Sequence, residues 1–416
     1  MRKLLTIALF SLILAPFFAS AQVNDSASIG AGYTNQTFYS LSKGTVLSIS
    51  NTDWDLGFHA DKREVSIIIN SKNDVKLWLA TNDTTKWATV DTAGKISVAQ
   101  QLHNSDSNWT NGAFNRVPNG TFDYGWGTYD QNSHAVIANN IYFISYMNGA
   151  NRVWKKIIIS KHSVDYVYYF RYANLDGSGE KSAAIVKASY PNRNFIYYSL
   201  VKDSIMNREP DRGTYDLIMC HYEQEIPVYY KVSGVLLNTG VKAKMAYPVA
   251  NKATADYKSY TLVKNISEIG AAWKTFNFTT NAYDMKDSTV YFVQDVTGKI
   301  WKLIFTGFGG GANGTMYFTK TQVGTNGIEA PETQVLGMYP NPSADMSVLN
   351  FYSKTAGTAS IRVTDITGKT IISETTPVEN GINQYEIDTR ALTNGTYIVQ
   401  VGGNGGVVSQ KLVVNR

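Results

Sequence analysis

The side chains that could do chemistry are few, and their spacing matches no common catalytic motif. The chain has no G-x-S-x-G elbow, H-E-x-x-H helix, phosphate-binding loop or dinucleotide fingerprint. Asp53, Asp55, Asp123 and Asp130 could be paired as the two carboxylates of a glycoside hydrolase. Asp55, however, recurs as Asp216 in a second copy of its motif, which favours a hydrogen-bonding role at a strand end. We therefore predict that the protein is not an enzyme.

The composition is typical of an extracellular all-β protein. Only 17% of the 416 residues are charged, whereas Tyr (27) and Trp (8) are abundant. The formal net charge is +5 and no dense basic run occurs, which argues against nucleic acid or a membrane surface as partner. Cys220 is the only cysteine, so no intrachain disulfide or cysteine-based zinc site can form and the core must supply the stability.

The first residues are typical of a secretory signal peptide. Two basic residues precede an apolar stretch at residues 4–18, and Ala19-Ser20-Ala21 supplies a cleavage site before Gln22. The apolar stretch is short for a membrane span, and no later stretch of 18 apolar residues follows. No cysteine lies near the cleavage site, which excludes lipoprotein processing. We expect residues 1–21 to be removed during export, leaving a mature chain without a membrane span.

An internal repeat organises the middle of the chain. Four matches carry it. They pair Tyr39-Ser40-Leu41 with Tyr198-Ser199-Leu200, Trp54-Asp55-Leu56 with Tyr215-Asp216-Leu217, Ile141-Tyr142-Phe143-Ile144 with Val290-Tyr291-Phe292-Val293, and Trp154-Lys155 with Trp301-Lys302. The first copy carries a longer insertion, near residues 81–129. We predict the first copy at residues 22–185, the second at 186–323, and a polar linker at 324–334.

Most elements of both copies are predicted to be strands. Tyr142 to Ile159 is expected to form a hairpin that turns at Asn148-Gly149, and Tyr291 to Thr306 one that turns at Thr297-Gly298. A short helix is expected near residues 264–273, where apolar residues recur at helical spacing. The predicted fold class is all-β, with two tandem β-units followed by a C-terminal β-sandwich.

The C-terminal segment, residues 335–416, has the period-2 pattern of half-buried strands in Ser360–Thr364 and Tyr397–Val401. Its motif residues follow in the order Tyr339, Pro340, Asn341, Pro342, then Asp365, Gly368, Lys369, then Gly395 and Tyr397. This series resembles the C-terminal sorting domain of the Bacteroidota type IX secretion system. The resemblance implies the secretion machinery as partner and the outer cell surface or the medium as destination. The other interpretation is an ordinary C-terminal β-domain used for oligomerisation or sugar binding.

A second resemblance covers roughly residues 33–323. The strand Trp54-Asp55-Leu56-Gly57-Phe58, the late hairpin of each copy and the aromatic strand that closes it resemble the HmuY family of haem-binding, all-β Bacteroidota proteins. Family members are commonly single-copy lipoproteins, whereas this chain lacks a cysteine for lipid attachment. In addition, Ile69-Asn70-Ser71-Lys72-Asn73 stands where the family has a Thr-Asn-Gly-rich stretch.

Haem is the cofactor that this resemblance implies. Haem binding needs an axial ligand, an apolar slot and a basic group for the propionates. His134 and His162 lie on either side of the first hairpin and form the candidate pair, whereas His59 belongs to the repeated motif and is more typical of a structural residue. No axial ligand of the family maps onto this sequence by motif. The remaining candidates are His103, His221, Met147, Met219, Met285 and Met316.

The aromatic insertion supports an alternative function, that of a surface adhesin or glycan-binding protein. It carries Trp78, Trp87, Trp109 and Trp126 among Asn, Asp and Thr residues. Exposed aromatic rings can stack on sugars while amides bind the hydroxyls, and such sites often lie on loops over a β-scaffold. The competing interpretation is that these rings pack the insertion against the body. The ligand predicted from the sequence is thus a small molecule or a glycan.

Overall fold

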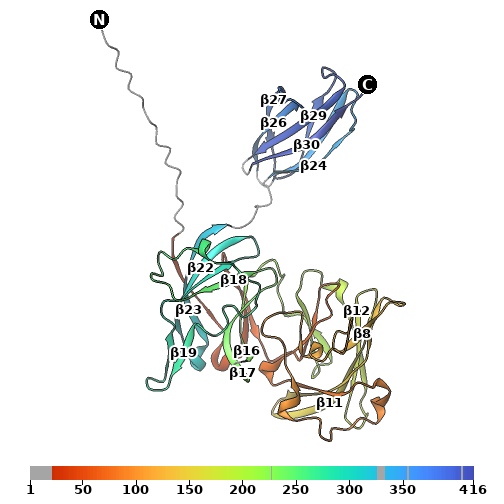
Figure 1. Cartoon of the computed structure of the whole chain (residues 1–416), viewed down its shortest axis with the longest axis vertical. Coiled ribbons are helices and arrows are strands. Elements are labelled where there is room, and N and C mark those ends of the chain that lie inside the picture. The colour runs from red at the N-terminus through yellow and green to blue at the C-terminus, as the bar shows by residue number, and fades with distance from the viewer. Residues whose placement is uncertain (1–20, 226, 326–332, 354–355, 404–405) are drawn as a thin grey trace. The chain divides into compact units, whose positions relative to one another are not determined.

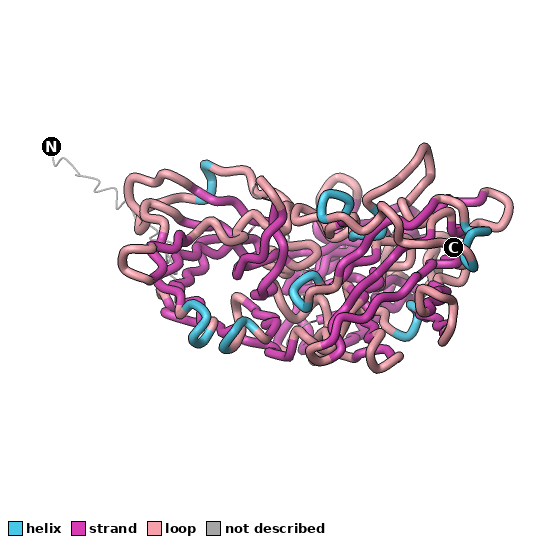
Figure 2. The backbone as a smooth tube through the Cα atoms, turned by 90° about the horizontal axis from the view of Figure 1, so that it is seen from below, coloured by secondary structure: helices cyan, strands magenta, loops and turns pink. Residues whose placement is uncertain are grey.

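The fold is almost entirely β, as predicted. A computed structural model describes residues 21–225, 227–325, 333–353, 356–403 and 406–416. The predicted signal peptide, apart from its last residue, and most of the predicted linker lie outside the described residues. The chain divides into two compact units on either side of Thr325, which we call the body and the tail domain (Figure 1). Strands dominate both, and the few helices are single turns (Figure 2).

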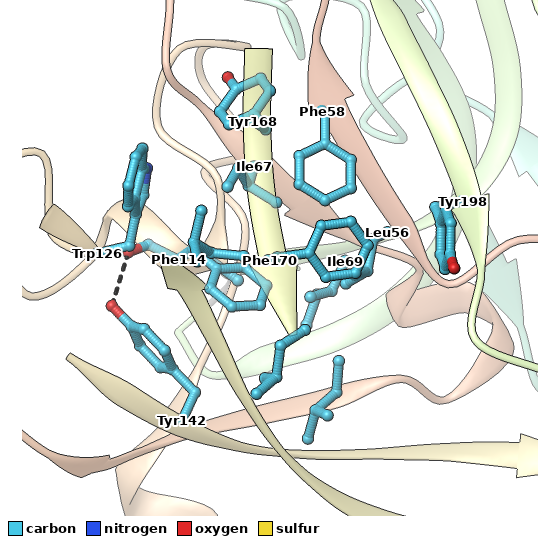
Figure 3. Packing of buried hydrophobic residues seen from close by; sticks show 14 of the residues in the cluster. Leu56, Phe58, Ile67, Ile69, Phe114, Trp126, Tyr142, Tyr168, Phe170 and Tyr198 are labelled. Atoms are coloured by element: carbon cyan, nitrogen blue, oxygen red, sulfur yellow. Dashed lines mark hydrogen bonds between the residues drawn. The ribbon is translucent and has the colours of Figure 1, made fainter. Parts of the chain in front are cut away.

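The body has two lobes, each with its own hydrophobic core. The core of lobe 1 contains Phe58, Trp126 and Phe170, which pack in a shared aromatic cluster (Figure 3). The core of lobe 2 contains residues from both ends of the body, such as Tyr39 and Trp273. We define lobe 1 as residues 54–212 and lobe 2 as residues 22–53 together with 213–325.

Lobe 1 is built from two antiparallel sheets. Its elements are β4 (Leu56–His59), β5 (Ile67–Ile69), η2 (Ser71–Asn73), β6 (Lys76–Thr81), η3 (Thr84–Ala88), η4 (Val98–Gln100), β7 (Gln101–Leu102), η5 (Ala113–Asn115), β8 (Gly127–Asp130), β9 (Ala135–Ala138), β10 (Ile141–Asn148), β11 (Asn151–His162), β12 (Val167–Ala173), β13 (Lys181–Val186), η6 (Lys187–Ser189), β14 (Phe195–Ser199) and β15 (Ser204–Met206). The larger sheet has the order β13-β12-β11-β10-β6-β7, with the β8-β9 hairpin attached to β11. The smaller sheet has the order β15-β14-β4-β5.

Lobe 2 repeats this arrangement. Its elements are β1 (Val23–Ser28), η1 (Ala31–Tyr33), β2 (Asn35–Ser40), β3 (Gly44–Ser50), β16 (Leu217–Glu225), β17 (Tyr229–Leu237), β18 (Lys242–Ala246), η7 (Tyr257–Ser259), β19 (Lys274–Asn277), β20 (Ala282–Met285), β21 (Val290–Gln294), β22 (Lys299–Phe308), α1 (Gly310–Asn313) and β23 (Thr315–Thr325). One sheet has the order β1-β23-β22-β21-β18 and the other β3-β2-β16-β17, and β19 and β20 form a separate hairpin.

The two lobes share one strand order, but the chain supplies their strands differently. Strands β13, β14 and β15 of lobe 1 occupy the places of β1, β2 and β3 in lobe 2. Accordingly Tyr198 of β14 lies opposite Leu56 of β4, and Tyr39 of β2 lies opposite Leu217 of β16. Each lobe therefore joins the opening strands of one sequence copy to the later strands of the other. As a result the lobes do not coincide with the predicted ranges 22–185 and 186–323, and lobe 1 is inserted between β3 and β16.

Both predicted hairpins are confirmed, but the helix predicted for residues 264–273 is wrong. Strands β10 and β11 are joined by a tight turn with Asn148 opposite Asn151, and β21 and β22 by a loop that contains Gly298 at φ 89°. Residues 264–273 instead form turns and one isolated bridge, at Gly270, because their backbone bonds the edge of β17. For example, the Leu237 N–H donates to the Ile266 carbonyl over 2.7 Å.

The tail domain is a two-sheet sandwich. Its strands are β24 (Thr333–Tyr339), β25 (Met346–Ser353), β26 (Gly357–Asp365), β27 (Thr370–Val378), β28 (Gly381–Asp388), β29 (Gly395–Gly403) and β30 (Gly406–Val414), in the sheets β24-β25-β28 and β27-β26-β29-β30. Ile361 and Val363 are buried on either side of the exposed Arg362, which confirms the predicted alternation.

Candidate functional site

The repeated Asp residues join the two sequence copies. A carboxylate oxygen of Asp55 accepts the backbone N–H of Leu200 over 2.6 Å, and one of Asp216 accepts that of Leu41 over 2.7 Å. Both side chains are buried. Burial raises the pKa of Asp55 to about 6 and also raises the pKa of Asp216. The predicted hydrogen-bonding role at a strand end is confirmed, and each bond links a motif of one copy to a motif of the other.

Other repeat residues anchor strands from within the cores. The Trp54 indole N–H donates to Asn51, and the buried Tyr215 hydroxyl donates to Glu209 over 2.9 Å. The Trp301 indole N–H donates to Asp295 over 2.8 Å. These contacts hold loops to strands, and none of the three side chains is presented to solvent.

The sequence alignment of Trp154 with Trp301 is wrong by one residue. Ile157 lies opposite Tyr142 in lobe 1, and Leu303 lies opposite the matching Tyr291 in lobe 2. Lys156 therefore corresponds to Lys302, and the two tryptophans fall on opposite faces of their sheets because side chains alternate along a strand. Trp154 stacks on Trp78 outside the main core, whereas Trp301 belongs to the core of lobe 2. The cause is the longer loop between β21 and β22.

The two candidate haem ligands lie near each other along the backbone but in different environments. His162 ends β11 and lies opposite Val136, so His134 is two residues from its backbone partner. His134 is exposed in the β8-β9 turn, with Nδ1 2.8 Å from the Tyr129 hydroxyl. His162 is 6% exposed and packs edge-on against Tyr168. The structure therefore does not assemble them into one preformed site.

His162 differs from the other histidines in one respect: its Nε2 is buried without a hydrogen-bond partner. The remaining three are engaged by the protein. His59 accepts the Asp61 N–H, His103 lies 2.8 Å from Glu223, and His221 stacks on Tyr33. These three are explained by packing and hydrogen bonding within the fold.

A cavity of about 480 Å³ in lobe 1 was not anticipated from the sequence. We call it the basic cavity, and it is lined by Ala60, Asp61, Lys62, Arg63, Lys187, Ala188, Pro191 and Arg212. The lining residues come from three distant segments, which no spacing rule connects. Lys187 is 1% exposed, and its ammonium donates to the carbonyls of Asp61 and Glu64 over 2.7 and 2.5 Å. Burial lowers the pKa of Lys187 to about 7, although the negative charges of Asp61 and Glu64 act to raise it.

The basic cavity lies close to His162 through a shared neighbour, the buried ring of Tyr168. The Lys187 ammonium lies 4.7 Å from the centre of this ring, and the imidazole of His162 lies 4.7 Å from the same ring. The unpartnered imidazole and the buried ammonium therefore belong to one region of lobe 1.

A second cavity lies between the lobes but is small. It has a volume of about 80 Å³, and Trp54, Phe195, Tyr215 and Cys220 are among its lining residues. Typical small-molecule sites measure roughly 300–1,000 Å³. This cavity has room for ordered water but not for a porphyrin.

The tryptophans of the aromatic insertion are packed rather than displayed, whereas its Phe122 and Tyr124 are exposed. Trp78, Trp87 and Trp126 are buried, and the half-buried Trp109 donates its indole N–H to the Leu237 carbonyl over 2.9 Å. The three buried rings offer no free face for a sugar to stack on. Their burial favours the interpretation that they hold the insertion against the two lobes.

The sorting-motif residues close the tail sandwich. Asn341, within the run Tyr339-Pro340-Asn341-Pro342, donates to the Lys411 carbonyl and accepts the Val413 N–H, both over 2.8 Å. Asp365 accepts the Lys369 N–H across the turn at Gly368, which has φ 88°. The buried Tyr397, two residues after Gly395, donates its hydroxyl to the Thr393 carbonyl. The described contacts of these residues are thus structural.

The fold and these sites define an all-β protein with a two-lobed body and a separate β-sandwich at its C-terminal end. A family model for the HmuY protein matches residues 32–321, and one for a secretion system C-terminal sorting domain matches residues 337–415. The first match covers well over half of the chain, which therefore belongs to the HmuY family. The sorting domain indicates type IX export to the cell surface or the medium and implies contact with that machinery.

Other comparisons add little. Among solved structures the chain is similar to the crystal structure of dimeric latent PorU from Porphyromonas gingivalis, with 11% identity over 67% of this chain and 26% of that one. The TM-score is 0.19, so this likeness carries no argument, and the chain spans about a quarter of that protein's length. No curated protein matches the chain. Across the described ranges, no helix combines the length and apolar character needed to cross a membrane.

Proposed function

We propose that the protein is a non-catalytic binding protein, displayed on the cell surface or secreted, whose ligand is haem held in lobe 1 by His162. Membership of the HmuY family suggests the ligand class. The observation that carries the assignment to a residue is the buried Nε2 of His162, which has no hydrogen-bond partner. A buried polar atom left without a partner is costly, so such an atom points to a ligand.

The chemistry of His162 fits an axial ligand. Haem iron is a Lewis acid that accepts the lone pair of a neutral imidazole. Burial, aided by the positive charge of Lys187, lowers the pKa of His162 to about 3, so its imidazole is neutral throughout the physiological range. His134 does not fit equally well in this conformation, because its side chain is exposed and bonded to Tyr129.

Haemin titration of the full-length protein tests this proposal. We expect a shifted Soret band for the wild type and loss of that shift for His162→Ala. His162→Met should bind with an altered band, since a thioether replaces the imidazole. His221→Ala is the matched control, because it removes a half-buried imidazole from lobe 2. Circular dichroism must confirm that each variant folds. An unshifted wild-type band, or a folded His162→Ala protein with the wild-type band, would refute the assignment.

A further inference from the structure

We propose that the basic cavity of lobe 1 is a binding site for a small organic anion, a molecule that carries carboxylate or phosphate groups. This site would exist whether or not haem binds at His162, because it rests on other residues. Its volume of about 480 Å³ falls within the range of typical small-molecule sites.

The charge of the cavity favours an anion. Among the lining residues, the four cationic side chains of Lys62, Arg63, Lys187 and Arg212 outnumber one carboxylate, that of Asp61, which gives a formal charge of +3 when Lys187 is protonated. The Glu64 carboxylate, which does not line the cavity but also acts on Lys187, reduces this surplus. Arginine is suited to such a ligand because its planar guanidinium binds carboxylate and phosphate groups through paired hydrogen bonds.

The cations around the cavity are poorly paired with protein acids. In the described part of the chain neither Lys62, Arg63 nor Lys187 forms a salt bridge, and Arg212 lies 3.9 Å from the Asp61 carboxylate. This contact is at the outer limit of an ion pair and is exposed to solvent, so it contributes little. Lys62 and Arg63 are also exposed. An incoming anion would therefore find these side chains available.

Lys187 positions the site rather than offering its own hydrogen bonds. Its donors are directed at the carbonyls of Asp61 and Glu64, so it fixes the loop that carries Lys62 and Arg63. When Lys187 is protonated, its charge lies in the cavity wall, where burial leaves it weakly screened. Lobe 2 has no counterpart, because Gly30-Ala31-Gly32-Tyr33 stands at the place of Lys187-Ala188-Ser189-Tyr190. The basic cavity is therefore a feature of lobe 1 and not of the strand arrangement that the two lobes share.

Two sources could supply the anionic group: a free organic acid, or the carboxylates of a porphyrin. Calorimetric titration of the full-length protein with citrate at constant ionic strength tests the first, and fluorescence titration with iron-free protoporphyrin IX tests the second. Arg212→Glu and Arg63→Glu should each weaken binding by about tenfold, since each removes a charge-assisted contact. Lys43→Glu is the matched control, because it makes the same charge change at an exposed turn of lobe 2.

Each outcome decides the proposal. Binding of either probe, weakened by both arginine variants and unchanged in Lys43→Glu, supports the site and identifies the source of the anion. Binding of neither probe at millimolar concentration overturns it, and so does an equal loss in Lys43→Glu. Citrate binding that survives in His162→Ala, while the haemin band is lost, would separate this site from the haem proposal. Conversely, if the wild-type protein does not bind haemin, the haem proposal fails, whereas citrate binding would still support the anion site.

Discussion

Lobe 1 and lobe 2 share one strand order, yet one is continuous in the chain and the other is split. Lobe 1 runs from β4 to β15 without interruption, whereas lobe 2 is assembled from β1–β3 and β16–β23. In Figure 1 the N-terminal strands, coloured red, accordingly lie among the green and teal strands of lobe 2. The unit repeated in the sequence is thus not the unit that packs around one core.

The lobes also differ in what they carry. Lobe 1 has the aromatic insertion, the basic cavity and the unpartnered imidazole of His162, whereas lobe 2 has a small residue at the place of Lys187. A duplicated frame allows one copy to keep a structural role while the other acquires ligand contacts. We therefore expect functional substitutions to act in lobe 1 and equivalent substitutions in lobe 2 to act on stability alone.

The largest expected effect tests whether the two lobes unfold together. Phe58 is fully buried in the core of lobe 1, with ring centres of Tyr168 and Phe170 each at 5.1 Å. Phe58→Ala should lower the free energy of unfolding by about 3–5 kcal/mol. Because lobe 1 lies between β3 and β16, its unfolding should release the strands of lobe 2 as well.

Urea denaturation followed by near-UV circular dichroism and hydrogen exchange provides the measurement. One transition should move to lower urea in Phe58→Ala and, equally, in Trp273→Ala, which truncates the core of lobe 2. If Phe58→Ala instead produces a separate transition at lower urea while the amides of β16 and β22 stay protected, the two lobes unfold independently. The split of lobe 2 by lobe 1 would then have no effect on its stability.

The next prediction concerns the equivalent carboxylates Asp55 and Asp216. Replacing either by Ala leaves a buried backbone N–H, that of Leu200 or Leu41, without its acceptor. Each variant should lose about 2–3 kcal/mol of unfolding free energy. Asp→Asn at either position keeps an acceptor oxygen and should lose less. Similar losses at both positions, measured by urea denaturation at pH 7, support equal roles. A loss at only one position would show that the two hydrogen bonds between the sequence copies are not equivalent.

Local pattern predicted the strands well but not their partners. The hairpins at Asn148 and Gly298, and the alternation around Arg362, follow from turn chemistry and period-2 burial, which are encoded within a few residues. The exchange between copies depends on pairing across 145 residues, from Asp55 to Leu200. No local signal distinguishes that pairing from the one within a copy.

The candidate site was predicted less well than the fold, again for a physical reason. His162 was a candidate in the sequence because it lies beside the first hairpin, but its missing hydrogen bond is visible only in the packed core. The basic cavity collects Lys62, Lys187 and Arg212 from three distant segments. The tryptophan alignment failed because one extra loop residue reverses which face a side chain takes, and similarity of Trp-Lys pairs does not report that change.

The buried histidines of lobe 1, His59 and His162, predict how the stability of the protein depends on pH. The native pKa of His162 is about 3 and that of His59 about 4, both well below the unfolded value of 6.5, because burial penalises the imidazolium. Below pH 6.5 the unfolded chain gains protons that the native state does not, so stability falls as the pH falls. At pH 5 this amounts to roughly 2 kcal/mol for each such histidine.

Other groups with shifted pKa values, among them Lys187 and Lys274 with a pKa of about 7, must be separated from this effect. Asp55, with its raised pKa of about 6, acts in the opposite direction, and His221 of lobe 2, with a pKa of about 4, acts in the same direction as His162. Comparing the wild type with His162→Gln between pH 7.5 and pH 5 isolates one group. The variant should lose about 2 kcal/mol less than the wild type over this interval. Equal losses would mean that His162 is protonated in the native state at pH 5.

The smallest expected effect concerns the buried lysines that the strand register places in equivalent positions. Lys156 donates to the Trp87 carbonyl and Lys302 to the Ala253 carbonyl, each over 2.6 Å, so each ties a covering loop to the outer face of a sheet. Lys→Met at either position leaves one carbonyl unsatisfied but also removes the cost of burying an ammonium. These terms oppose each other, and we expect a net loss of only about 1–2 kcal/mol at each position.

Lys155→Met is the control that decides between the two alignments. The sequence alignment makes Lys155 the counterpart of Lys302, whereas the register assigns that place to Lys156. Lys155 is only half-buried and bonds the side chain of Asn174 rather than a loop carbonyl. If the register is correct, urea denaturation should show similar losses for Lys156→Met and Lys302→Met and a smaller loss for Lys155→Met. If the losses of unfolding free energy for Lys155→Met and Lys302→Met agree and that for Lys156→Met differs, the sequence alignment is correct. Lys156 and Lys302 would then not occupy equivalent positions in the two lobes.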